Sequence, residues 1–425
     1  MRSARSLISA SLVAALAAAS ASSAAASTAA APPPASPPAA ASPPAASAAA
    51  SKASARCDNF FGQRCRVALS TGVSMSYFEV GPPAGETLIF LHTDTTSAVD
   101  WAWTGAALAR LDPALRLIAL DQRGAGSSEL PATELCWNHP NLCMTRSELA
   151  ADVLAFMDVR GIAQATLVGH AMGASVARRI ALEHPERVTR LILSGVGVAA
   201  PKEPRAAAGS ASSPPRPPPY GDMRLLGWQQ MAAAKGVRWP DGALHMRPLD
   251  IDPDAVRNIS EHWDISAIAL PSVVQAIAAQ TALESLATWQ RLDSTPVPAE
   301  HEDPFDRLAT PTLSLWGSED AGLDRASQER LIARLREAVR AHAGMTFYWK
   351  QYGLRPPPPS GDKHEADDIG HNLSWEAPAE LAADIDRYVR TGAPTRDLYH
   401  TDFPRDIHRI VVEPGKANIV SSEAH

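Results

Sequence analysis

The ten residues 165–174, reading ATLVGHAMGA, decide the fold of this 425-residue chain. Residues 165–169 are predicted to form a strand. A helical pattern begins at Met172 and continues to residue 183. Gly169 and Gly173 keep the turn between strand and helix small enough for a close approach of the two elements. A strand that runs directly into a helix is one unit of a parallel sheet covered by helices.

The same alternation extends in both directions, from about residue 66 to residue 390. It predicts an α/β fold with a mostly parallel eight-stranded sheet flanked by helices. Strands are expected at 66–69, 74–81, 87–91, 115–120, 165–169, 188–194, 312–316 and 346–352. Helices are expected at 101–111, 146–159, 172–183, 325–341 and 378–390. Between the sixth and seventh of these strands only helical patterns occur, at 223–235, 252–263 and 266–289. They predict an all-helical lid inserted after the sixth strand.

The first residues are typical of an export signal. Arg2 and Arg5 precede an uncharged apolar run and then small residues, which predicts a signal peptide over residues 1–27 and a secreted or periplasmic protein. The apolar run is too short for a stable membrane span, which needs about 20 residues. Residues 28–56, rich in Ala, Pro and Ser, are expected to be a disordered linker. The predicted core comprises 57–200 and 305–392, with a Pro-rich linker and the lid at 201–304 and a C-terminal tail at 393–425.

Composition excludes several classes of partner and cofactor. Lys and Arg number 39 against 46 Asp and Glu, and the formal net charge is -7, so no nucleic-acid partner is expected, because phosphate binding needs clustered basic residues. No zinc spacing, phosphate-binding loop or dinucleotide motif occurs, so we expect no metal and no cofactor. A small-molecule substrate or ligand is the remaining partner. The oligomeric state does not follow from the sequence.

Four cysteines suit the oxidising compartment that an export signal implies. Cys57 and Cys65 lie eight residues apart, and Cys136 and Cys143 lie seven apart. We predict two local disulfides, although four cysteines permit three connectivities. A structural role is favoured over a metal site because neither pair has C-x-x-C spacing.

Five segments together resemble the α/β-hydrolase superfamily over roughly residues 66–392. Residues 165–174 are similar to its nucleophile elbow, G-x-S-x-G. Residues 90–92 (FLH) and 120–128 (LDQRGAGSS) match strand-and-turn segments of that family, residues 318–320 (SED) resemble its acid turn, and residues 368–375 (DIGHNLSW) resemble its histidine loop. The resemblance implies that Asp320 is the catalytic acid and His371 the catalytic base, with Glu319 as a competitor for the acid position.

The chain departs from the family pattern at the elbow and in the loop after the third strand. Ala171 stands at the nucleophile position and has no nucleophilic atom. The resemblance assigns the oxyanion and substrate side to the backbone N–H of Met172, to His92, Thr93 and Asp94, and to His170. In the family a glycine usually follows the histidine, whereas here Thr93 and Asp94 enter the loop.

Asp94 has two interpretations. A fixed negative charge opposes stabilisation of an oxyanion, so a structural role is favoured, in which Asp94 caps the helix that begins near Trp101 or bonds its own loop. The alternative is contact with the substrate or with a water molecule.

Several functions therefore stay open. The first is an exported hydrolase in which a His371–Asp320 dyad activates water against a small ester, lactone, amide or similar carbonyl bond; the aminoacrylate hydrolase of pyrimidine breakdown has a similar Ala-containing elbow. The second is a non-catalytic pseudo-hydrolase that binds a small apolar ligand. An inactivated Ser-to-Ala variant of a serine esterase and a cofactor-free oxygenase are the remaining possibilities.

Overall fold

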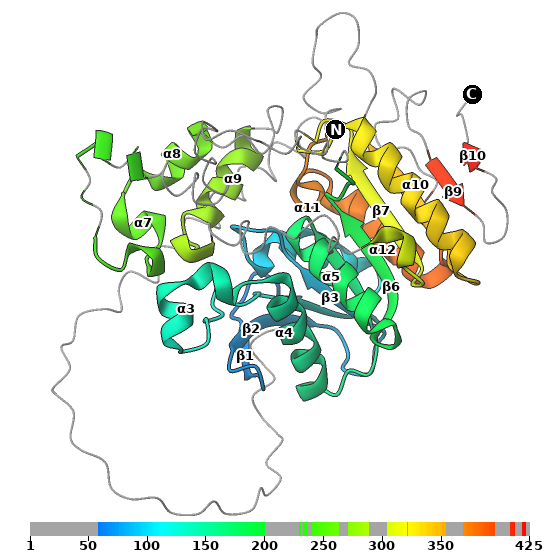
Figure 1. The fold of residues 1–425 in the computed structure, drawn as a ribbon, viewed down its shortest axis with the longest axis horizontal. Coiled ribbons are helices and arrows are strands. Elements are labelled where there is room, and N and C mark those ends of the chain that lie inside the picture. The colour runs from blue at the N-terminus through cyan, green and yellow to red at the C-terminus, as the bar shows by residue number, and fades with distance from the viewer. Residues whose placement is uncertain are drawn as a thin grey trace, which may run out of the picture.

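The computed structural model describes residues 58–199, 229–230, 233–236, 238, 240–262, 271–288, 304–320, 322–353, 369–395, 409–412 and 419–421. Their strands form one sheet with the order β1-β2-β4-β3-β5-β6-β7-β8-β9-β10 (Figure 1). The strands are β1 (Cys65–Ala68), β2 (Ser74–Val80), β3 (Thr87–Leu91), β4 (Arg116–Leu120), β5 (Ala165–His170), β6 (Val188–Ser194), β7 (Thr312–Gly317), β8 (Phe347–Tyr352), β9 (Arg409–Val412) and β10 (Ile419–Ser421).

The eight predicted strands are β1 to β8, and the predicted α/β-hydrolase architecture is confirmed. Pairing is parallel from β4 through β3, β5, β6 and β7 to β8, and antiparallel at β1–β2 and β2–β4. Strands β3, β4, β5 and β7 are buried at every residue. This burial on both faces explains why these strands are mostly apolar.

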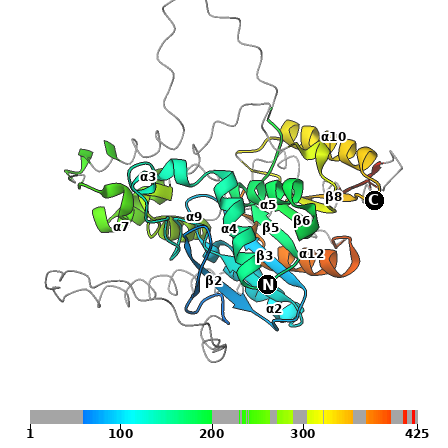
Figure 2. The same ribbon diagram turned by 60° about the horizontal axis from the view of Figure 1, so that its bottom comes forward.

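Helices cover the two faces of the sheet. One face packs against α4 (Arg146–Val159), α5 (Met172–Glu183) and α10 (Arg325–Ala341). The other packs against α2 (Ala102–Leu111) and α12 (Pro378–Thr391). Alternate residues of one strand serve the two layers, as Ile89 and Leu91 face the first and Leu88 and Phe90 the second. Figure 2 shows α2 and α12 on the side away from α4 and α5.

A helical insertion follows β6, as the sequence predicts. Its described elements are η4 (Ala243–His245), α7 (Pro248–Ile251), α8 (Ala255–His262) and α9 (Pro271–Thr281), which gather at one side of the sheet in Figure 1. They share a small core that includes Ala255, Ile259 and Ala278. A second cluster joins α9 to the main domain, because Val273 and Ile277 pack with Trp375. Most of the helix predicted at 223–235 lies outside the described residues.

Two strands within the predicted C-terminal tail and three short connecting elements were not predicted from the sequence. Strand β9 pairs antiparallel with β8, and β10 pairs with β9, so the tail extends the sheet to ten strands. The connecting elements between β4 and α4 are α3 (Glu134–Asn138) and η2 (Pro140–Cys143), and η1 (Ala98–Trp101) precedes α2. The short helices η3 (Pro185–Arg187), η7 (Phe305–Arg307) and α11 (Leu373–Glu376) complete the described elements.

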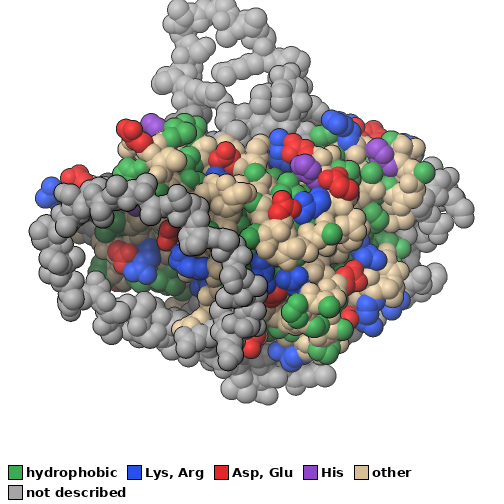
Figure 3. Space-filling model, turned by 90° about the horizontal axis from the view of Figure 1, so that it is seen from below, with side chains coloured by type: hydrophobic (Ala, Val, Ile, Leu, Met, Phe, Trp, Pro, Cys, Tyr) green, Lys and Arg blue, Asp and Glu red, His purple; other side chains and the backbone are tan. Residues whose placement is uncertain are grey.

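The surface viewed in Figure 3 carries acidic and basic side chains interspersed with apolar ones. Within the ranges given above, no helix has the length and apolar character needed to cross a membrane. The predicted signal peptide and linker lie outside the described residues, and Cys57 does as well.

Candidate functional site

The elbow between β5 and α5 is a strained turn. Ala171 has φ 47° and ψ -106°, a conformation that side-chain-bearing residues rarely adopt. The flanking glycines permit it, since a Cβ at Gly173 would lie 2.2 Å from the carbonyl oxygen of Leu91. A Cβ at Gly169 would lie 2.5 Å from the backbone nitrogen of Ala174. The turn therefore has the geometry that presents the residue at position 171 above the sheet edge.

Asp320 and His371 meet at this edge, from segments 51 residues apart. Asp320 follows β7, and its Oδ2 lies 2.7 Å from His371 Nδ1. The Asp320 side chain is buried, whereas that of His371 is 19% exposed. Nδ1 is occupied by Asp320, and Nε2 has no hydrogen-bond partner among the described residues. A Cβ added at Gly195, which directly follows β6, would lie 3.2 Å from His371 Nε2, so Nε2 lies beside the strand end next to the elbow.

The surroundings of His371 favour its charged form. Burial lowers the pKa of the imidazole, but the hydrogen bond and charge of Asp320 raise it, and the charges of Asp94 and Glu376 add to this effect. The net result is a pKa above the ordinary value of 6.5. Asp94 is thus within electrostatic reach of His371.

His170 belongs to a buried network that the sequence did not reveal. Its Nδ1 lies 3.0 Å from Asp100 Oδ2, and its Nε2 lies 3.0 Å from the carbonyl oxygen of His371. Asp100 also accepts hydrogen bonds from Ser374 Oγ (3.1 Å) and Trp375 Nε1 (2.7 Å). Burial raises the pKa of Asp100, but His170 and Trp375 outweigh it and leave the pKa below its usual value. The network ties the loop of His371 to the helical turn η1.

Glu376 is a second residue that the sequence analysis missed. Its carboxylate accepts the N–H of Gly370 (2.8 Å) and the N–H of Asn372 (3.0 Å), which bracket His371 in the chain. Burial raises the pKa of Glu376, and these two N–H groups oppose that effect. The only sequence signal for it is an acidic residue five positions after the histidine.

The loop after β3 uses the predicted residues in part for its own structure. His92 Nδ1 lies 2.6 Å from the carbonyl oxygen of Thr93, and His92 Nε2 accepts the N–H of Gln122 at 3.0 Å. The N–H of Thr93 donates to Asp100 Oδ2 at 3.3 Å, and its hydroxyl donates to Asp94 Oδ1 at 3.0 Å. Asp94 therefore bonds its own loop.

Two details of this edge bear on the oxyanion side. The helical turn η1 is capped by the side chain of Ser97, so the helix-capping alternative for Asp94 is wrong. Met172 is the first residue of α5, where a helical N–H has no acceptor within the helix. The N–H of Met172 thus remains suited to an oxyanion.

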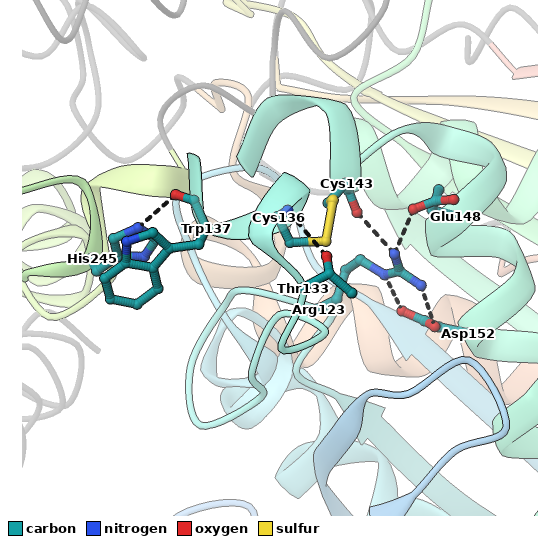
Figure 4. The surroundings of a disulfide bond; sticks show 8 residues. All are labelled: Arg123, Thr133, Cys136, Trp137, Cys143, Glu148, Asp152 and His245. Carbon is teal, nitrogen blue, oxygen red and sulfur yellow. Dashed lines mark hydrogen bonds and ion pairs between the residues drawn. A yellow bond between two sulfur atoms is a disulfide. The ribbon is translucent and has the colours of Figure 1, made fainter. Parts of the chain in front are cut away.

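One predicted disulfide is present, between Cys136 and Cys143 (Figure 4). It closes the segment of α3 and η2, and Arg123 Nη1 donates to the carbonyl oxygen of Cys143 at 2.9 Å. Cys65 is also disulfide-bonded, while Cys57 lies outside the described residues. In the part of the chain that the structure describes, no three His, Cys, Asp or Glu side chains cluster as metal ligands would.

Comparison with known proteins adds relatives to this geometry. The chain is similar to a 2-hydroxymuconate semialdehyde hydrolase of Pseudomonas sp. (strain CF600), with 31% identity over 137 residues, which are 32% of this chain and 45% of that protein. It is also similar to epoxide hydrolase B of Mycobacterium tuberculosis, with 30% identity over 155 residues, which are 36% of this chain and 38% of that protein. The chain spans less than half the length of these relatives.

Among solved structures, a hydrolase from Pseudomonas aeruginosa PA01 has a TM-score of 0.49 at 20% identity, covering 77% of this chain and 98% of that chain. The enol-lactonase from Burkholderia xenovorans LB400 has a TM-score of 0.49 at 18% identity, covering 77% and 100%. The family model described as alpha/beta hydrolase fold matches residues 86–352, more than half of the chain. The chain therefore belongs to the alpha/beta hydrolase fold family.

Proposed function

We propose that this protein is a hydrolase in which His371, paired with Asp320, activates water against a small ester, lactone, amide or similar carbonyl bond. The observation that carries the proposal is the 2.7 Å contact between His371 Nδ1 and Asp320 Oδ2. A carboxylate in this position holds the imidazole in the tautomer whose Nε2 accepts a proton, and stabilises the imidazolium that forms. The names of the relatives, a semialdehyde hydrolase and an epoxide hydrolase, support hydrolysis as the reaction class.

Water replaces a side-chain nucleophile in this mechanism because position 171 is alanine. His371 Nε2 takes a proton from water while the water oxygen attacks the carbonyl carbon, and the electron pair of the C=O bond moves onto its oxygen. That oxyanion accepts a hydrogen bond from the N–H of Met172. The C=O bond then re-forms, the bond to the leaving oxygen or nitrogen breaks, and the leaving group takes the proton from the imidazolium.

Two carboxylates, the buried Asp100 and the partly buried Glu376, would position the base without touching substrate. Asp100 holds His170 against the carbonyl oxygen of His371, and Glu376 fastens the backbone on both sides of His371. Such support is what fixes a catalytic group within the small tolerance that proton transfer requires. A protein that only binds a ligand has no need for an imidazole held in this way.

We propose further that the protein acts after export. The apolar run behind Arg2 and Arg5 and the Cys136–Cys143 disulfide support an oxidising location. Peptide analysis of the protein recovered from the periplasm or medium tests this: the expected product begins after residue 27, and an intact N-terminus on a cytoplasmic protein would contradict export.

The hydrolase proposal is tested by a screen of aryl acetates, lactones, carbamates and simple amides against purified full-length protein. We expect hydrolysis of at least one class, and a loss of about 10²-fold or more in kcat on His371→Ala. His184→Ala, which changes a partly exposed histidine away from the site, is the matched control and should retain full activity. Asp320→Asn should lower kcat while Glu319→Gln should not. Turnover that persists in both His371→Ala and Asp320→Asn would reject the dyad, and no turnover in any class would favour the non-catalytic binder.

A further inference from the structure

One threonine in the loop after β3 has an unusual backbone conformation. Thr95 has φ 56°, and Thr95 and Ala171 are the two non-glycine residues with positive φ in the described chain. A β-branched residue in this region is a genuine outlier, since its Cβ crowds the backbone. Glycine would adopt the same conformation without strain. The loop therefore keeps a threonine where the backbone favours glycine.

The same hydroxyl is buried without a partner. Thr95 is 1% exposed, and its Oγ1 has no hydrogen-bond partner among the described residues. A buried polar group that lacks a partner destabilises the folded state, so each such group in a protein calls for an explanation. Thr95 thus combines a strained backbone with an unsatisfied hydroxyl. Residues with strained backbones cluster at functional sites.

The rest of the loop satisfies its own polar side chains. Thr93 Oγ1 donates to Asp94 Oδ1 at 3.0 Å, and Thr96 Oγ1 donates to the carbonyl oxygen of Thr93 at 3.2 Å. Ser97 Oγ accepts from Arg64 Nη2 at 3.3 Å. In residues 92–97, all of which the structure describes, the Thr95 hydroxyl is the polar side-chain group left unpaired.

Thr95 lies in a loop at the same edge of the sheet as the elbow. It follows β3, which pairs with β5 in parallel, so Leu91 is the neighbour of Gly169 and both strands end at the same edge. Carboxyl ends of neighbouring parallel strands are where ligands bind in such sheets. The preceding residue, Asp94, is close enough to raise the pKa of His371, and the N–H of Thr93, a predicted oxyanion donor, is engaged with Asp100.

We propose that the Thr95 hydroxyl donates a hydrogen bond to the carbonyl oxygen of the substrate and serves as the second oxyanion donor beside the N–H of Met172. The proposal rests on the proposed function for the nature of the substrate. A side-chain donor in this place replaces the Thr93 amide and counters the negative charge of Asp94 near the developing oxyanion. Glycine at position 95 would relieve the strain but would remove the donor.

The test uses a reaction that does not depend on the natural substrate. Ala171→Ser supplies a hydroxyl at the elbow beside His371, and a fluorophosphonate probe places its phosphoryl oxygen where the substrate oxyanion would lie. In this background we expect Thr95→Val to slow labelling by about 10²-fold, the usual loss for one oxyanion donor. Thr95→Ser, which keeps the hydroxyl, should label within about threefold of the background rate. Thr96→Val, which removes the neighbouring paired hydroxyl, is the matched control and should also label at close to that rate.

A second measurement tests the same residue through stability. Thr95→Gly should slow labelling as Thr95→Val does, yet raise the Tm by about 2–4 °C, because it removes both the strain and the unsatisfied hydroxyl. Labelling of the Thr95→Val variant at the background rate, or a Tm that falls in Thr95→Gly, would overturn the proposal. These outcomes leave the His371 dyad intact. Failure of Ala171→Ser itself to label, with circular dichroism unchanged, would instead contradict the elbow geometry on which both proposals depend.

Discussion

At the scale of single residues, the protonation of His371 controls the proposed reaction. The imidazole must be neutral to take a proton from water, and Asp320 with Asp94 and Glu376 holds its pKa above 6.5. Activity should therefore rise with pH through an inflection above 6.5 and level off at higher pH. Asp320 raises the pKa of His371 more than any other group does. Asp320→Asn should therefore move the inflection to lower pH while the maximum rate falls. A kcat profile between pH 5 and 10 measures both, and an inflection that stays in place would argue against His371 as the base.

The contribution of His371 to the free energy of unfolding should fall as the pH rises, whereas the activity should rise. The folded-state pKa of His371 lies above its unfolded value of 6.5, so the stabilisation from the Asp320 pair is fully present below pH 6.5. It is lost as the pH rises through the folded-state pKa. The unfolding free energy of the parent chain should exceed that of Asp320→Asn by more at pH 6 than at pH 9, which urea denaturation at the two pH values measures. An equal difference at both would mean that the pair is not ionised as described.

The sequence predicts the dyad but not its supports. Asp320 and His371 follow from short motifs with their own local pattern. Asp100 contacts Ser374 and Trp375 across more than 270 positions, and no local pattern marks such a partner. The strain at Thr95 is equally invisible, since φ depends on how the whole loop is held between β3 and η1.

At the scale of secondary-structure elements, the approach of α5 to β3 is set by glycines. A Cβ at Gly173 would lie 2.2 Å from the carbonyl oxygen of Leu91, which is backbone and cannot move aside. Gly173→Ala should cost more than about 4 kcal/mol, a loss found only for severe disruption. Gly161→Ala is the matched control, because Gly161 has φ +64° but nothing within 4 Å of an added Cβ. Its cost should be about 1–2 kcal/mol from the left-handed backbone alone. Urea denaturation compares the two, and equal costs would show that the close approach does not govern packing here.

Strands buried on both faces were the easiest elements to predict from sequence. The short apolar run of β4 and the mostly apolar β5 before the elbow are typical of strands buried between two helical layers. The tail strands β9 and β10 were missed because they gain their partner only from the edge of β8. The short helix α3 was missed as well, since five residues with a cap at Thr133 give no helical period.

At the scale of the whole molecule, the disulfide segment connects the core to the lid. Trp137, in this segment, stacks on His245 of the lid with ring centroids 3.7 Å apart, and the carbonyl oxygen of Trp137 lies 2.9 Å from His245 Nε2 (Figure 4). A second contact joins the lid to the core, from the N–H of Gly126 to Glu284 Oε2 at 2.5 Å. The lid therefore contacts the core at these two places as well as through the cluster of Val273, Ile277 and Trp375.

Removal of this disulfide should weaken the folded state without altering the dyad. Replacing Cys136 and Cys143 together with serine should cost about 2–3 kcal/mol in the chain-entropy model for so short a loop. Urea denaturation measures the cost, and Trp137→Ala in the intact protein separates the lid contact from the cross-link. A double variant as stable as the parent would mean that the segment is held by its other contacts, such as the Arg123 bond to Cys143.

The central claim is that water, and not a side chain, attacks the substrate. It is tested most directly by intact-protein mass spectrometry on samples quenched within a single turnover of whichever substrate the screen identifies. The account predicts that the parent chain keeps its unmodified mass throughout, while Ala171→Ser accumulates an acyl adduct located at position 171. An acyl or alkyl adduct on the parent chain, at any residue and formed at the rate of turnover, would contradict the account.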